Sequence, residues 1–173
     1  MKNNPTYETE RLIIRPTQIE DAAFILALMN TEDWLKNIGD RGVRTLEDAE
    51  NYIKEKMLPQ LERLGYSNNT VIRKSDGVKM GSCGLYDREG LEGVDIGFSF
   101  LPAYYKQGYA QESALKVKEL AIKEFGLTQI SAITTKTNYP SQKLIEKLGL
   151  KFIKYINLPN DSEELMFYQL RVN

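Results

Sequence analysis

The stretch VDIGFSFLPAYYKQGYAQESA, from Val94 to Ala114, decides the fold. Its first part reads as a strand that ends at Leu101, before Pro102, and its last part reads as the start of a long helix. The loop between them ends at Gly108, which lets a phosphate approach the backbone. Because the N-terminus of a helix offers free amides and about half a positive elementary charge, we interpret this junction as a pyrophosphate cradle. The alternative is a glycine that only serves the turn before a helix.

Outward from this stretch, hydrophobic periodicity and turn signals predict the rest of the fold. Strands that follow one another directly are expected to be antiparallel, and strands joined through a helix parallel. The expected fold class is α/β, a mixed, twisted sheet of about seven strands with helices on both faces, in the order β-α-α-β-β-β-α-β-α-β-β. We expect one domain, residues 1–173, with its core at about 9–171. The expected strands are 11–16, 69–73, 78–86, 94–101, 129–135, 151–157 and 165–171. One helix is expected to follow a capping box at Thr17-x-x-Glu20 and to end near residue 29. Further helices are expected over 46–64, with a kink at Pro59, over 110–125 and over 139–148.

The composition excludes several kinds of chemistry, because the 173 residues include no histidine and one cysteine, Cys83. Ser-His-Asp and Cys-His catalysis and histidine-bound zinc or haem are excluded. A lone cysteine forms no internal disulfide, which favours a reducing compartment. The net charge of −1 argues against a general nucleic-acid binder. The polar stretch Met1–Glu10 lacks the apolar run of a signal peptide, and no run approaches the roughly 20 residues that span a bilayer. We therefore expect a cytoplasmic protein without nucleic-acid, membrane or metal partners.

Several segments, in the right order, resemble the GNAT superfamily of N-acetyltransferases and most closely its RimJ/RimL-like branch. The resemblance covers the chain from Thr9 to about Arg171 and implies a single GNAT-like domain. The matching segments are Thr9-Glu-Arg-Leu-Ile-Ile-Arg15 for T-x-R-L-x-L-R, Asp95-Ile-Gly-Phe98 for E-I-G-Y, Tyr105-Lys-Gln-Gly108-Tyr-Ala110 for the acetyl-CoA signature Q/R-x-x-G-x-G/A, and Asn138-x-x-Ser141 with Glu146-Lys-Leu-Gly149 for N-x-x-S-x-x-x-x-E-K-x-G-F.

The chain departs from the family pattern at three positions. Tyr105 replaces the Gln or Arg that begins the signature, which removes one side-chain contact to the cofactor phosphates. Ser99 stands where an aromatic residue is frequent, and this change widens the acceptor side. Ile145 stands where many GNAT enzymes place a tyrosine that protonates the leaving thiolate.

The resemblance implies direct attack of a primary amine on the thioester of acetyl-CoA, without a metal. A backbone amide of strand 94–101 would polarise the thioester carbonyl, because fixed donors need little reorganisation as charge develops. Asp95 is the candidate proton acceptor, with a surface or loop-pairing role as the alternative. Ser141 is the candidate proton donor, and its alternative role is to satisfy free amides in the first turn of a helix. The implied cofactor-binding residues are Phe98, Ser99, Phe100, Lys106, Gln107, Gly108, Tyr109, Ala110, Asn138, Ser141 and Lys147.

The absence of a strong base favours an acceptor whose amine is already partly neutral. An α-amine has a pKa of about 7.7–8.0, whereas a lysine-like amine of about 10.4 is neutral only about one time in a thousand near pH 7.5. A protein or peptide N-terminus is therefore favoured, and small-molecule amines stay open, as do the monomeric and homodimeric states. Two alternatives are a non-catalytic acyl-CoA binding or sensing domain of the same fold, and a binder of another phosphorylated ligand.

Overall fold

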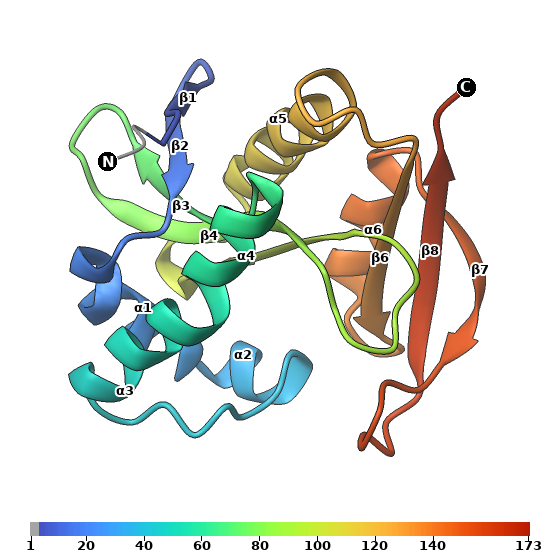
Figure 1. Ribbon diagram of the computed structural model, residues 1–173, viewed down its shortest axis with the longest axis horizontal. Helices are drawn as coiled ribbons and strands as arrows, with labels where there is room; N and C mark the ends of the chain where they lie inside the picture. Colours follow the sequence, from blue (N-terminus) through green and yellow to red (C-terminus); the bar gives the residue numbers. More distant parts are fainter. Residues whose placement is uncertain (1–3) are drawn as a thin grey trace.

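The computed structural model describes residues 4–173, so that residues 1–3 of the expected domain and of the polar N-terminal stretch lie outside the description. The strands of the described part form one sheet with the order β1-β2-β3-β4-β5-β6-β8-β7 (Figure 1). Strands β5 and β6 pair in parallel, and the other neighbours are antiparallel. The strands are β1 (Tyr7–Glu8), β2 (Leu12–Pro16), β3 (Asn68–Arg73), β4 (Lys79–Tyr86), β5 (Asp95–Phe100), β6 (Gln129–Thr135), β7 (Lys151–Ile156) and β8 (Leu165–Arg171).

The helices form two groups along the chain. The first group joins β2 to β3, and Figure 1 shows it gathered beside strands β1 to β4. The second group follows β5 and β6. The helices are η1 (Ile19–Asp21), α1 (Ala22–Met29), α2 (Glu32–Asn37), α3 (Leu46–Tyr52), the π-helical η2 (Ile53–Met57), α4 (Leu58–Leu64), η3 (Pro102–Tyr104), α5 (Tyr109–Lys123) and α6 (Tyr139–Lys147).

The main hydrophobic core lies between the sheet and helices α5 and α6. Ile96 and Phe100 of β5 pack there against Val117 of α5 and Ile145 of α6. Because side chains alternate along a strand, the intervening residues of β4 and β5 point to the other face. A second core cluster joins α1, α3 and η2. A hydrogen bond from Thr70 on β3 to Asp21, at the start of α1, ties this helical group to that face. The α/β class with helices on both faces is thus confirmed.

The sheet has eight strands instead of seven, because the two-residue strand β1 adds to the edge beside β2. The expected helix 46–64 is interrupted by a π-helical turn just before Pro59, which sits in the first turn of α4 and has no amide hydrogen to donate. The capping box at Thr17-x-x-Glu20 is wrong. The carboxylate of Asp21 accepts from the amide of Gln18, and the hydroxyl of Thr17 pairs instead with Thr70 inside the protein.

The expected strand directions are correct for β5 and β6 and wrong for β2 and β3. These two strands are antiparallel neighbours although helices lie between them in the sequence. The connection between them, residues 17–67, contains several helices and is long enough for the chain to enter the sheet again in either direction. Strand β8 lies between β6 and β7, which places β7 at the edge of the sheet.

Candidate active site

The loop before α5 has the geometry expected of an anion cradle. Gly108 is the N-cap of α5 and has φ +83°, and Lys106, two residues earlier, has φ +60°. Left-handed residues next to right-handed ones turn successive N–H groups toward one point, and the first turn of a helix adds N–H groups without intrahelical partners. A left-handed lysine costs energy, and such strain gathers at functional sites. The predicted cradle residues Lys106, Gln107 and Gly108 are exposed, so the loop is open to a ligand.

Strands β5 and β6 part next to this loop. Their parallel register is confined, in the described structure, to Asp95 and Ser131, with the Ser131 amide donating to the carbonyl of Val94. Along β5 the backbone groups alternate in direction, and the amide of Leu101 donates to Met80 on β4. The amide and carbonyl of Phe98 therefore point toward β6, past the place where the two strands have separated. The amide of Phe98 is therefore a backbone donor that lies outside the β5–β6 register.

The side of β5 that faces the first helical group is small and polar. Gly97 and Ser99 lie opposite Gly84 and Ser82 of β4. The ring of Tyr86 rests on Gly97, where an added Cβ would lie 2.9 Å from the ring. The Tyr86 hydroxyl donates to Asn68 at 2.5 Å, and burial raises the Tyr86 pKa, so that this group stays a donor. The glycine at 97 is thus required by the tyrosine above it.

Asp95 is buried and engaged by Arg88, a residue of the loop between β4 and β5. The Arg88 Nε lies 3.0 and 3.1 Å from the two carboxylate oxygens. Burial raises the pKa of Asp95 above its ordinary value, and the charge of Arg88 opposes this rise. The hydroxyl of Ser131, opposite Asp95 in the sheet, is buried without a hydrogen-bond partner in the described structure. The ion pair favours the loop-pairing role for Asp95, and its role as a proton acceptor stays a prediction.

Asn138 and Ser141 lie together at the N-terminus of α6. The side-chain oxygen Oδ1 of Asn138 accepts from the backbone amide of Ser141 at 3.3 Å, so Asn138 is the N-cap of α6. Both side chains are partly exposed. Lys147 is exposed in the last turn of α6, and a whole helix separates it from Asn138. Ile145 is buried in the core, so the position where the resemblance implies a tyrosine holds an aliphatic packing residue.

Glu112, in the first turn of α5, is held by the turn that precedes β2. Its carboxylate accepts from the Thr9 hydroxyl at 2.7 Å and from the Arg11 amide and Nε at 2.9 and 2.7 Å. Burial acts to raise the pKa of Glu112, but these hydrogen bonds outweigh it and lower the pKa below its ordinary value. The sequence did not single out Arg11 as a site residue. The one signal for it was that Thr9 and Arg11 lie in the segment that resembles T-x-R-L-x-L-R of the family.

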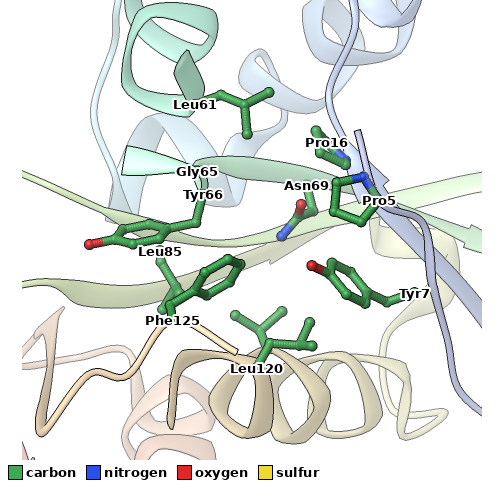
Figure 2. A pocket seen from close by; sticks show the side chains of 11 residues that line it. Pro5, Tyr7, Pro16, Leu61, Gly65, Tyr66, Asn69, Leu85, Leu120 and Phe125 are labelled. Atoms are coloured by element: carbon green, nitrogen blue, oxygen red, sulfur yellow. The ribbon is translucent and has the colours of Figure 1, made fainter. Parts of the chain in front are cut away.

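Neither Cys83 nor the cavity beside α5 belongs to the predicted site. Burial raises the pKa of Cys83 to about 12, so its thiol is not a nucleophile near neutral pH. A cavity of about 20 Å³ lies under the C-terminal half of α5, and Figure 2 shows the Tyr7 hydroxyl pointing toward it from beside Leu120. That volume suits a single water molecule. The cavity lies away from the loop at Gly108, so it is not the predicted site.

Residues 4–173 contain no helix that is long and apolar enough to cross a membrane. In the same range, no three cysteine, aspartate or glutamate side chains gather into a group that could hold a metal ion.

Comparison with known proteins decides the family. Residues 11–151 match the model of the acetyltransferase (GNAT) domain. The chain belongs to the GNAT acetyltransferase family. This GNAT protein is 29% identical over 143 residues to the uncharacterised N-acetyltransferase YnaD of Bacillus subtilis, covering 83% of the chain and 81% of YnaD. It is 25% identical over 148 residues to YoaA, another uncharacterised N-acetyltransferase of that organism, covering 85% of the chain and 83% of YoaA.

Solved structures agree with the family. A GNAT-family acetyltransferase from Bacillus anthracis superimposes with a TM-score of 0.79 at 27% identity, covering 96% of this chain and 98% of that one. RimL, a ribosomal L7/L12 α-N-protein acetyltransferase in complex with coenzyme A, gives a TM-score of 0.82 at 12% identity, covering 97% of this chain and 98% of that one. At this low identity, the similarity to RimL shows a shared fold and nothing more. The GNAT protein is an acyltransferase, as predicted, and the non-catalytic alternative is not favoured.

Proposed function

We propose that this GNAT protein transfers an acetyl group from acetyl-CoA to a primary amine, and that its favoured acceptor is the α-amine of a peptide or protein. The observation that supports this function best is the parting of β5 and β6 beside the loop that ends at Gly108. A phosphate chain at the loop would direct a pantetheine arm into the opening, toward the amide of Phe98. RimL, whose fold is similar, is named as an acetyltransferase of protein α-amines.

The Phe98 amide is the proposed donor to the thioester oxygen. Because this strand is held by β4 along its whole length, the amide is already oriented when charge develops on the oxygen. A fixed donor of this kind is worth about 3–4 kcal/mol of barrier in acyl transfer. The main chain of Ser99 and Phe100, which follow Phe98 on β5, is the proposed further contact with the acetyl and pantetheine groups. The Asn138 side-chain amide is the proposed partner of the pantetheine arm.

The attacking amine loses a proton and the leaving thiolate gains one. The carboxylate of Asp95 is occupied by Arg88, so we propose an acceptor that needs no strong base. An α-amine meets this requirement, because it is already partly neutral near pH 7.5 and can release its remaining proton to water. A lysine-like amine would need about 4 kcal/mol to deprotonate near pH 7.5. The Ser141 hydroxyl at the start of α6 is the proposed donor to the thiolate.

Thiol release tests the proposal. The protein is mixed with acetyl-CoA and a panel of amines and short peptides with free or blocked N-termini, and free CoA is measured with a chromogenic disulfide. We expect release with free α-amines above polyamines and lysine side chains, and none with N-terminally blocked peptides that lack lysine. The buried Cys83 contributes no background in the folded protein. CoA binding without release for any amine would support the non-catalytic alternative instead, and stabilisation by ATP or NAD equal to that by CoA would refute the cofactor.

A further inference from the structure

One side chain contacts each part of the junction between the loop and α5. Arg11, in the turn between β1 and β2, donates from NH1 to the carbonyl of Gln107 at 3.0 Å. Its guanidinium carbon lies 4.3 Å from the ring centroid of Tyr109, and its NH2 is 3.2 Å from the place of a Cβ on Gly108. Its Nε is fixed by the carboxylate of Glu112 at 2.7 Å. The side chain therefore spans the last residues of the loop and the first turn of the helix.

The contact with Gln107 determines where the next amide points. In a trans peptide group the C=O and the following N–H point in opposite directions. Because Arg11 holds the Gln107 carbonyl on its own side, the N–H of Gly108 points to the other side, away from the guanidinium. That is the side on which we place the phosphates of CoA. Arg11 thus orients a donor of the cradle without standing in the cradle.

The rest of the environment fits this role. The loop contains Lys106 in a left-handed conformation, and a strained residue persists only where its surroundings hold it. The signature position that other family members fill with Gln or Arg is Tyr105 here, so the loop lacks that contact. Glu112 in turn anchors Arg11 through two hydrogen bonds and accepts a third from Thr9. These bonds join two segments about a hundred residues apart.

We propose that Arg11, anchored by Glu112, is a positioning residue that holds the phosphate-binding loop in its ligand-ready form before CoA binds. The inference rests on the proposed function, because it assumes that the loop binds the CoA phosphates. It assigns the effect to the shape of the guanidinium, which bonds Gln107 and Glu112 at once, and not to its charge. A lysine has one ammonium on a flexible stem and does not reproduce this fork.

Calorimetric titration of CoA into purified variants tests the proposal. We expect Arg11→Ala and Arg11→Lys to weaken CoA binding by similar factors, about ten- to hundredfold, which is the range of a charge-assisted hydrogen bond. Arg63→Ala is the matched control, because it removes an exposed arginine that is also ion-paired, with Asp87. Its CoA affinity is expected to stay within about twofold of the wild type.

Glu112→Ala gives a test of sign. Removing a negative charge near a polyanion strengthens binding if charge alone matters. We expect the opposite, a CoA affinity reduced by at least about threefold, because Arg11 loses its anchor. With an amine accepted in the thiol-release assay, the KM for acetyl-CoA rises in these variants while kcat stays within about twofold. Melting temperatures of the ligand-free variants show whether the fold is retained.

The outcomes separate the two proposals. If the wild type does not bind CoA, the proposed function fails and this inference fails with it. If the wild type binds CoA, three results overturn the inference alone: unchanged affinity of Arg11→Ala, full affinity of Arg11→Lys, or tighter binding by Glu112→Ala.

Discussion

The hydroxyl of Tyr105 donates a hydrogen bond of 2.7 Å to the carboxylate of Asp33, and this bond joins the loop before α5 to the short helix α2. At the other end of α2, the side chain of Asn37 accepts a long hydrogen bond, 3.4 Å, from Thr135 at the end of β6. Helix α2 therefore connects the elements that follow the carboxyl ends of β5 and β6, where these strands have parted. The residue that departs from the acetyl-CoA signature is the one that makes the first connection.

Tyr105→Phe should affect the acceptor more than CoA. The substitution keeps the ring and removes the bond to α2. This helix contains Trp34, and the family resemblance implies that Trp34 and the helices around it form part of the acceptor wall. Because the bond is exposed, we expect a KM for the amine about two- to fivefold higher, and a CoA affinity within about twofold of the wild type. Steady-state thiol release at varied amine concentration measures the first, and calorimetry the second. Tyr155→Phe, an exposed tyrosine on the edge strand β7, is the control. A larger effect on CoA than on the amine would contradict the assignment of α2.

Gly108→Ala should weaken CoA binding because an added Cβ is opposed in two ways. The residue has φ +83°, which costs an L-residue about 1–2 kcal/mol, and the Cβ would lie 3.2 Å from Arg11 NH2. We expect roughly a tenfold loss of CoA affinity, and complete loss for Gly108→Glu, which adds an anion to the cradle. Gly77→Ala is the matched control, with φ +73° and open space around its Cβ. It should lower the melting temperature without changing CoA affinity, and equal CoA binding by both alanine variants would argue against the loop.

Asp95→Asn should lower stability more than turnover. The side-chain amide introduced by this substitution leaves the half-buried Arg88 without a carboxylate partner. Removal of one partner of an ion pair costs about 3–5 kcal/mol of stability when both partners are buried. Since Arg88 is partly exposed, we expect about 1–3 kcal/mol, measured by urea unfolding. Asp87→Asn, in an exposed pair with Arg63, should cost less than about 1 kcal/mol. A loss of turnover beyond about a hundredfold, with CoA binding intact, would instead establish Asp95 as the proton acceptor.

The local elements were predictable from the sequence where apolar residues alternate or recur at helical spacing between clear turn signals. The predicted limits of β6 and β8 are those of the structure, and the loop at Gly108 lies directly before α5. These features depend on neighbours in sequence, so local patterns contain the information. The resemblance to the GNAT family then indicated which junction to propose as the cofactor site.

The contacts between side chains of the site were not predictable in this way. Arg88 leaves a loop to reach Asp95, and Arg11 contacts residues that lie about a hundred positions away. Such pairs leave no periodic signal in one sequence. The insertion of β8 between β6 and β7 has the same cause, because either order satisfies the hairpin and the buried faces.

Substitution of Asp21 tests how much its buried carboxylate, at the start of α1, contributes to stability. Its carboxylate is fully buried, receives two hydrogen bonds from Arg15, at 2.7 and 2.8 Å, and lies 2.7 Å from Lys79 Nζ. Burial acts to raise the pKa of Asp21, but the hydrogen bonds from Arg15, the Gln18 amide and Lys79 outweigh it and hold the pKa well below its usual range. The folded state therefore binds this proton less readily than the unfolded chain does.

The sign of the pH effect follows from this difference. A carboxyl whose pKa is depressed by folding contributes stability at every pH above its unfolded value of about 3.9, and that contribution falls away as the pH drops toward the folded pKa. We expect Asp21→Asn to lower the free energy of unfolding by about 3–5 kcal/mol at pH 7, because two cations then lose their partner. Urea unfolding between pH 7 and pH 3 should show a constant difference between wild type and variant down to about pH 4 and a smaller one below it. A difference that is equally large at pH 3, or that grows as the pH falls, would show that the carboxylate is not what holds Arg15 and Lys79 on this face.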